Sequence, residues 1–268
     1  MRHSQFGTFA STQHPSDVLR IATYNIHKGV RGLGPRMRLE IHNLVLGIEA
    51  LDADIVFLQE VRRQNRAVAR RFPDTHHGWP RVPQADYLAP EGYEVAYRTN
   101  AVTRDGEHGN ALLSRWPLGG DVGHHDVSDH RFEQRGLLHV AVHWNGVKVN
   151  AIVAHFGLIH KSRVRQAQRL AEFIEKNVPR DELLVVAGDF NDWADRLDPE
   201  MHSAGLRRAL VEGEPPGRVN TFPSRIPVFP MDRIYARGLR CLSTAVPRGT
   251  AWARMSDHLP LVAELALA

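Results

Sequence analysis

Residues 183–191 read Leu-Leu-Val-Val-Ala-Gly-Asp-Phe-Asn, an apolar run that ends in polar residues and predicts a strand. Residues 54–60 (Asp-Ile-Val-Phe-Leu-Gln-Glu) form another such run, which is typical of a buried strand. Residues 19–26 (Leu-Arg-Ile-Ala-Thr-Tyr-Asn-Ile) roughly alternate, as a half-buried strand does. From Arg36 to Leu51 apolar residues recur at steps of three and four, which predicts a helix between these two strands. The order strand, helix, strand predicts an α/β fold.

The remaining chain repeats this theme, so we expect one domain over residues 18–268. The patterns predict strands at 109–115, 136–144, 147–156, 231–235 and 259–267 and a helix at 162–177. Residues 73–92 and 212–230 are rich in Pro and Gly and lack periodicity, which predicts long surface loops. Residues 1–17 contain no apolar core, so we expect a disordered N-terminal segment and neither a secretory signal nor an anchor.

The composition excludes several classes of protein. The 268 residues are 43% hydrophobic and 24% charged, with a mean hydropathy of −0.34, which argues against a membrane protein and a wholly disordered chain. The single Cys241 excludes an intramolecular disulfide and a cysteine-based zinc site. The net charge of +4 comes almost wholly from arginine, which favours contact with phosphate but is equally explained by codon usage. We expect a cytoplasmic monomer without a transmembrane segment.

Polar residues collect where the apolar runs begin or end. They are Asn25, Glu60, His155, Asp189, Asn191 and the pair Asp257-His258. Ligands bind beyond the strand ends of an open α/β sheet, so these side chains are expected to converge on one site. Each alone has an ordinary explanation. Gly-Asp-Phe-Asn at 188–191 is also typical of a strand entering a turn, and a lone glutamate is typical of the first turn of a helix.

Seven short motifs follow one another along the chain. They are Thr23-Tyr24-Asn25-Ile26-His27, Leu58-Gln59-Glu60, Gly-Asn-Ala-Leu-Leu-Ser-Arg at 109–115, Ala154-His155-Phe156, Gly188-Asp189-Phe190-Asn191, Asp232-Arg233-Ile234 and Ser256-Asp257-His258. The series resembles the endonuclease/exonuclease/phosphatase superfamily over residues 19–267. The stretch Tyr-Asn-Ile-His-Lys-Gly at 24–29 is similar to that of a bacterial subgroup of metal-dependent hydrolases. The resemblance implies a four-layer α/β sandwich, with two mixed β-sheets packed face to face and flanked by helices, and a magnesium-dependent phosphoesterase.

The resemblance also implies a metal site. Glu60 would be the principal ligand, with Asn25 beside it and Asp257 completing the metal side. A hard cation held by such oxygen donors offsets the negative charge that repels an attacking water from a phosphate ester. Oxygen donors favour Mg²⁺ or Mn²⁺ over zinc.

The catalytic roles implied by the resemblance fall to five other residues. Asp189 and Asn191 would position and deprotonate the attacking water, or hold a second metal. His258, steadied by Asp232, would face the phosphate, and His155 would donate to the phosphate or to the leaving oxygen. Imidazoles hold or pass a proton near neutral pH, and a carboxylate partner keeps one tautomer in place.

Three further residues have two interpretations. The Asn110 amide would orient the water or the phosphate, as the family's Gly-Asn-Ala motif implies, or it would close a turn before the strand. Arg135 and Lys28 lie near motif ends and would bind phosphate, or they are solvated surface charges.

Other histidine-containing segments are expected to lie outside the site. Ser-Asp-His at 128–130 repeats the last motif, but a charged stretch follows it, so we expect a loop there. The pairs at 76–77 and 124–125 have no third ligand at a suitable spacing, and adjacent strand residues point to opposite faces. We expect all of these imidazoles to be surface groups.

The expected activity is hydrolysis of a phosphodiester, in nucleic acid or in a phospholipid-type substrate. A phosphomonoesterase acting on a small metabolite is the alternative, and a catalytically inactive binding module is the third interpretation. Nucleic acid would use the arginines for backbone contact. A lipid substrate would need apolar loop tips, for which the sequence offers Trp79, Tyr87, Leu88, Phe222 and Phe229.

Overall fold

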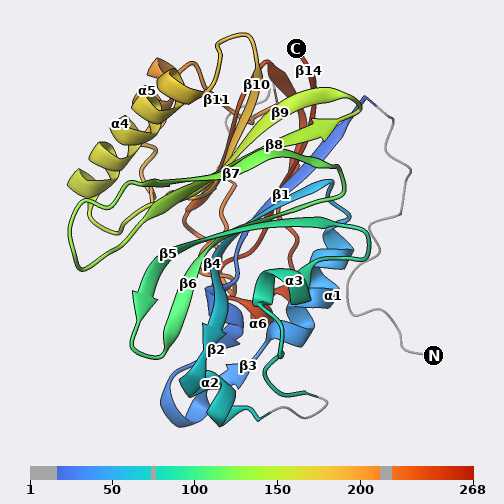
Figure 1. The fold of residues 1–268 in the computed structure, drawn as a ribbon, viewed down its shortest axis with the longest axis vertical. Helices are drawn as coiled ribbons and strands as arrows, with labels where there is room; N and C mark the ends of the chain where they lie inside the picture. The colour runs from blue at the N-terminus through green and yellow to red at the C-terminus, as the bar shows by residue number, and fades with distance from the viewer. Residues whose placement is uncertain (1–16, 74–76, 212–218) are drawn as a thin grey trace.

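The computed structural model describes residues 17–73, 77–211 and 219–268, and two six-stranded sheets form the centre of the fold (Figure 1). The first sheet contains, in spatial order, β13 (Leu239–Ala245), β14 (Leu261–Leu267), β1 (Leu19–Asn25), β4 (Ile55–Asn65), β6 (Gly106–Ser114) and β5 (Glu94–Thr103). The second contains β11 (Arg207–Arg208), β12 (Asp232–Arg237), β10 (Leu183–Asp189), β9 (Val147–His155), β8 (Gly136–Trp144) and β7 (Leu118–Asp126).

Both sheets are mixed. β1 and β4 run parallel to each other, as do β9 and β10, and the other neighbours in each sheet are antiparallel. Each parallel pair is joined by a helix: α1 (Ile41–Leu51) between β1 and β4, and α4 (His160–Asn177) between β9 and β10. Parallel strands require such a crossover, and they end at the same edge of the sheet.

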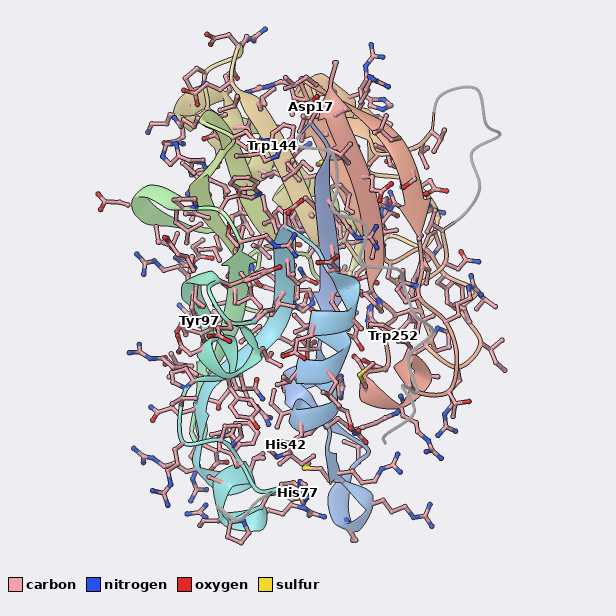
Figure 2. All side chains as sticks on the ribbon, turned by 90° about the vertical axis from the view of Figure 1, so that its right-hand side faces the viewer. Asp17, His42, His77, Tyr97, Trp144 and Trp252 are labelled. Atoms are coloured by element: carbon pink, nitrogen blue, oxygen red, sulfur yellow. The ribbon has the colours of Figure 1, made fainter. Side chains whose placement is uncertain are left out.

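Three apolar layers hold the sheets and helices together. The inter-sheet layer joins residues such as Ile21 and Phe57 of the first sheet to Val153 and Ala187 of the second. A second layer packs α1, α3 (Gln84–Leu88) and α6 (Trp252–Met255) on the outer face of the first sheet, where Figure 2 shows Trp252 close to α1. A third packs α4 and α5 (Asp198–Ser203) on the second sheet. The predicted four-layer α/β sandwich is confirmed.

Several element boundaries differ from the sequence expectation. The first helix begins at Ile41 and not at Arg36, because residues 34–36 form a 3₁₀ turn and β3 (Arg38–Leu39) pairs with β2 (Val30–Arg31). β4 continues past Glu60 to Asn65, where α2 (Arg66–Arg71) follows. Strands β5, β7 and β13 were not predicted. β7 contains three glycines, which have low strand propensity, and its pairing with β8 outweighs that preference.

The predicted loops also contain packed structure. The 73–92 stretch includes α3, and both Trp79 and Leu88 are buried, so they are not the exposed loop tips that the sequence suggested. The predicted N-terminal segment lies outside the described residues except for Asp17. His77 is exposed and its ring packs edge-on against that of His42 (Figure 2). Within the described ranges, every helix is too short or too polar to cross a lipid bilayer.

The close approach of β10 to β9 makes Gly188 a sensitive position. A Cβ atom there would lie 1.8 Å from the Ala154 carbonyl oxygen, and backbone cannot yield as a side chain can. We expect Gly188→Ala to lower the free energy of unfolding by about 1–3 kcal/mol, measured by urea denaturation. Gly123→Ala is the control, because the nearest atom to its Cβ would be 3.5 Å away. Equal midpoints for the two variants would contradict this reading of the strand contact.

Candidate active site

The site lies at the edge where both parallel strand pairs end. In the second sheet, Asp189 is in register with His155 of β9 and with Asp232 of β12. Asp189 stands two positions after Ala187, His155 two positions after Val153, and Asp232 two positions before Ile234. Those three apolar residues belong to the inter-sheet layer. Because side chains alternate along a strand, all three polar groups face the first sheet. Asn25 reaches the same edge at the end of β1.

Asp189 is the point where the polar groups of the two sheets meet. Its Oδ2 accepts a hydrogen bond from Asn25 Nδ2 at 3.0 Å and lies 3.6 Å from His258 Nε2 and 3.7 Å from His155 Nε2. Its Oδ1 accepts from the Asn191 backbone N–H at 2.9 Å. Burial raises the pKa of this carboxyl to about 6, although His258 opposes the rise. Asp189 can therefore exchange a proton near neutral pH.

His258 forms a buried ion pair with Asp232. Its Nδ1 donates to Asp232 Oδ2 at 2.8 Å, and the same oxygen accepts from the Thr221 hydroxyl at 2.6 Å. Burial alone would lower the pKa of His258, but Asp232 and Asp189 outweigh burial and raise it to about 10. The imidazole is therefore protonated at neutral pH. Thr221 was missed by sequence reasoning because it sits in an aperiodic Pro-rich stretch that carries no positional signal.

Glu60 reaches the site through a β-bulge. The register between β4 and β6 shifts between Leu58 and Val61, and Glu60 has a φ of 57°. Leu58 faces the outer layer, and because side chains alternate along a regular strand, Glu60 would face the same way. The extra residue of the bulge turns the Glu60 side chain toward the inter-sheet face. Sequence reasoning identified Glu60 but ended the strand there, because a bulge leaves no compositional mark.

Two carboxylates gather around the segment that follows β1. Glu60 Oε2 lies 2.9 Å from Lys28 Nζ and 4.0 Å from His27 Nδ1, and Asp257 Oδ2 lies 3.3 Å from the same His27 atom. Asn25 Oδ1 accepts from the His27 backbone N–H at 3.0 Å. These oxygens form the set that the sequence suggested for a metal.

The charge state of Glu60 is suited to a cation. Burial would raise its pKa, but His155 and, at contact distance, Lys28 hold the pKa well below its usual range. Burial itself keeps the pKa of His155 well below that of a free histidine, so at neutral pH Lys28 is the cation that Glu60 faces. An ionised carboxylate already paired with an ammonium group, with further oxygen donors close by, fits a hard divalent ion.

A second candidate metal cluster has another explanation. Ligand atoms of Asp189, Asp232 and His258 all lie within 4.8 Å of one another and are buried. Asp232 Oδ2, however, already accepts from both His258 and Thr221. We therefore interpret this cluster as a hydrogen-bonded imidazole–carboxylate relay, with the oxygen donors around Glu60 as the better metal site.

Backbone strain is concentrated at the site. Seven non-glycine residues of the described chain have positive φ, and four of them are His27, Lys28, Glu60 and Asn191. Such conformations cost about 1–3 kcal/mol each and persist where the surrounding structure imposes them. Here hydrogen bonds do so: the Asn191 side chain donates to the Phe156 carbonyl at 2.9 Å, and its backbone donates to Asp189.

The remaining predicted residues lie around this centre. Asn110 is fully buried, and its amide donates to the carbonyls of Gly136 and Val153, so its described bonds join the two sheets. Arg135 donates to the Phe156 carbonyl and pairs with Glu133 at 2.8 Å.

The other histidines have different surroundings. His130 lies in the expected loop and forms a β-bridge with Glu133. His108, which the sequence did not single out, sits on β6, where burial and the nearby Lys28 lower its pKa to about 4. Its imidazole is therefore neutral at physiological pH.

The chain is similar to proteins of a known family. The model of the Endonuclease/Exonuclease/phosphatase family matches residues 22–258. The chain belongs to this family. Over 254 residues it is 35% identical to the protein YbhP of Escherichia coli (strain K12), a match that covers 92% of this chain and 96% of YbhP. It is 24% identical over 218 residues to sphingomyelinase C of Listeria ivanovii, which covers 70% of this chain and 60% of that enzyme.

Solved structures of the endonuclease/exonuclease/phosphatase fold superpose well. A protein of this family from Beutenbergia cavernae DSM 12333 gives a TM-score of 0.75 at 22% identity, covering 94% of this chain and 72% of that one. TDP2 of D. rerio, complexed with a single-strand DNA product, gives 0.64 at 18% identity, covering 92% and 98%. The predicted family is confirmed, and the protein is a phosphoesterase of this superfamily.

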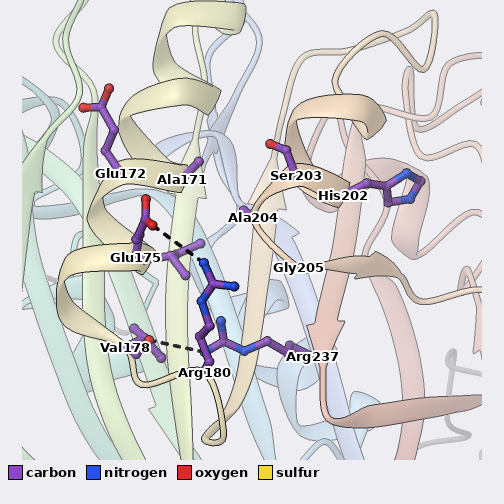
Figure 3. A pocket seen from close by; sticks show the side chains of 11 residues that line it. Ala171, Glu172, Glu175, Val178, Arg180, His202, Ser203, Ala204, Gly205 and Arg237 are labelled. Atoms are coloured by element: carbon purple, nitrogen blue, oxygen red, sulfur yellow. Dashed lines mark hydrogen bonds and ion pairs between the residues drawn. The ribbon is translucent and has the colours of Figure 1, made fainter.

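A separate cavity of about 440 Å³ lies between α4 and α5 (Figure 3). Its lining includes Glu175, which pairs with Arg180 at 3.7 Å, and His202. The ion pair is largely solvent-exposed, so it contributes little and its charges are screened. The groove has the character of an ordinary polar surface.

The His258–Asp232 pair generates a pH-dependent prediction for the metal-free protein. The folded pKa of His258, about 10, exceeds the ordinary value of about 6.5, so the pair stabilises the fold fully below about pH 6.5 and loses this contribution as the pH rises through about 10. We expect Asp232→Asn to lower the free energy of unfolding by about 3–5 kcal/mol at pH 6, and by less near pH 10.

Urea denaturation across this pH range checks the expectation, and histidine NMR locates the titration directly. Asp121→Asn, at an exposed position of β7, is the matched control and is expected to change the unfolding free energy little. A wild-type His258 resonance that titrates between pH 6 and 7 would contradict the assigned pairing.

Proposed function

We propose that the protein hydrolyses phosphodiesters with the help of Mg²⁺ or Mn²⁺. The observation that carries this proposal is the division of the site into two halves that meet at Asp189. One half holds the oxygen donors of Glu60, Asp257 and Asn25 around His27. The other half holds the imidazoles of His258 and His155, each within 3.7 Å of the Asp189 carboxylate.

The metal half would hold the cation through Glu60 and Asp257, with Asn25 beside them. A divalent ion bound there supplies charge that offsets the negative phosphate ester. Asn25 serves both halves, since its Oδ1 faces His27 and its Nδ2 fixes Asp189.

The imidazole half would accept and donate the protons of the reaction. Asp189, with its raised pKa, would take a proton from the water whose oxygen forms the new bond to phosphorus. His258 carries a proton at neutral pH, so it would bind a phosphate oxygen and protonate the alkoxide released when the ester bond breaks. His155 is neutral and buried, so it would orient the phosphate through an N–H donor without transferring a proton.

The Lys28 and Arg135 side chains near the site are already paired with protein groups, which favours a diester substrate over a monoester. Lys28 is held by Glu60, and Arg135 by Glu133 and the Phe156 carbonyl. A phosphomonoester brings a second negative charge that needs additional compensation, whereas a diester brings one per phosphate. Among relatives, the names sphingomyelinase C and TDP2 with a DNA product point to lipid and nucleic-acid diesters respectively, and both are compatible with this centre.

Glu60 provides the test of metal dependence. Glu60→Gln keeps the side-chain size and removes the charge, so we expect Mn²⁺ binding to weaken in calorimetry. We also expect bis-p-nitrophenyl phosphate hydrolysis to fall by about 10²-fold or more, since a bound cation supplies several kcal/mol of transition-state stabilisation. EDTA should abolish the wild-type activity, and Mg²⁺ or Mn²⁺ should restore it. Glu91→Gln, at an exposed turn, is the control. Full activity of metal-free protein would refute the mechanism.

The second test concerns the number of ester bonds on phosphorus. Because the nearby cations are already paired, we expect kcat/KM for bis-p-nitrophenyl phosphate to exceed that for p-nitrophenyl phosphate. Both substrates release the same phenolate, so the comparison isolates the charge on the phosphate. A clear preference for the monoester would favour the phosphomonoesterase alternative.

A further inference from the structure

Exposed apolar side chains gather in loops beside the imidazole half of the site. Thirteen large hydrophobic residues of the described chain are exposed, and six of them form what we name the apolar rim: Phe132, Leu158, Ile159, Trp193, Ile226 and Phe229. Phe132 is 99% exposed and Ile226 is 72% exposed. Single exposed apolar residues need no explanation, but a connected set next to a catalytic centre indicates an interaction surface.

Ring contacts and hydrogen bonds connect the rim from one loop to the next. The rings of Trp193 and Phe229 are 6.0 Å apart, and the Arg163 guanidinium lies over Trp193 at 5.7 Å. Arg163 also donates to the Leu158 carbonyl, and the Leu158 N–H donates to Glu133, the residue after Phe132. The rim therefore spans the loops after β7, β9 and β10 and the segment that precedes β12.

The rim also reaches the catalytic histidine. Phe222 forms a β-bridge with Phe229, and its ring packs 4.9 Å from the ring of His258. A partner bound to the rim would thus lie beside His258, the side chain proposed to bind the phosphate. This places the rim at the mouth of the site and not on an unrelated face.

Exposed cationic side chains stand one or two positions along the chain from three of the rim residues. Arg131 precedes Phe132, Lys161 follows Ile159 by two residues, and Arg225 precedes Ile226, and all three cations are exposed. Nearby acids are neutralised within the protein: Glu133 by Arg135 at 2.8 Å, and Asp129 by Arg165. Apolar tips flanked by Lys or Arg are the composition that binds the interface of an anionic bilayer.

We propose that the apolar rim docks the protein onto an anionic lipid surface, so that the phosphodiester of a lipid headgroup enters the site. This rests on the proposed phosphodiesterase function and specifies its substrate class. Half of the rim side chains, Leu158, Ile159 and Ile226, are aliphatic and offer no ring for stacking on a nucleobase, and the Arg163 guanidinium lies over the Trp193 ring. Aliphatic and aromatic side chains alike gain free energy by leaving water for hydrocarbon. These features favour lipid over nucleic acid.

Vesicle sedimentation tests the proposal with the full chain. We expect wild-type protein to bind vesicles of phosphatidylglycerol and phosphatidylcholine more tightly than pure phosphatidylcholine, and less tightly at high salt. Phe132→Ser/Ile226→Ser should weaken partitioning by about tenfold or more, because two apolar side chains no longer enter the interface. Leu33→Ser/Val102→Ser is the matched control, since these residues are 83% and 73% exposed and lie outside the rim.

Three results would overturn the docking proposal. They are no vesicle binding by wild-type protein, equal loss in the two double variants, and a rim variant that loses affinity for single-stranded DNA but keeps its affinity for vesicles. Hydrolysis of the soluble bis-p-nitrophenyl phosphate is measured in parallel. Wild-type activity on that diester without vesicle binding refutes docking alone, whereas vesicle binding without diester hydrolysis refutes the phosphodiesterase function and leaves docking supported.

Discussion

The hydrogen bond from Asn25 to Asp189 is the interaction on which the rest of the site depends, because it joins the first sheet to the second at their common edge. Asp189 has almost no contact with solvent, so its charge is stabilised by protein groups alone. One oxygen faces Asn25 and two imidazoles, and the other is fixed by the backbone of Asn191. The geometry of the candidate site thus depends on how the two sheets pack, and the inter-sheet core sets it.

The two halves of the site differ in electrostatics because different elements build them. The metal half comes from a strained loop after β1 and from a bulge in β4, and it carries partly exposed carboxylates that a cation can neutralise. In the imidazole half, His155, Asp189 and Asp232 come from strands of the second sheet, whereas His258 comes from the segment just before β14 of the first sheet. All four are buried, so their charges must be paired internally, as His258 and Asp232 are. In the proposed mechanism the oxygen donors around His27 would bind the cation and the imidazole half would transfer protons, so the two tasks of ester hydrolysis would fall to different residues.

Apolar periodicity predicted the α/β class and the polar residues at the strand ends, whereas the two-sheet sandwich was implied by the resemblance of seven short motifs to a known family. The sequence placed Asn25, His155 and Asp189 at the ends of strands, where the structure has them, but it ended the strand of Glu60 at that residue, whereas β4 continues to Asn65. It did not predict the bulge that turns Glu60 inward, since a bulge depends on the partner strand β6. Thr221, edge strands such as β7, and the burial of Trp79 likewise depend on contacts with distant parts of the chain.

The position of β14 has a consequence for how the chain is made. β1 lies between β4 and β14, and β14 leaves the ribosome after the other strands of the two sheets. Until then β1 has one row of unpaired N–H and C=O groups, and an apolar sheet edge of that kind recruits other strands. His258, just before β14, is synthesised after the other polar residues of the candidate site. Until β14 has been made, the nascent chain therefore lacks His258 and exposes a strand edge that favours aggregation.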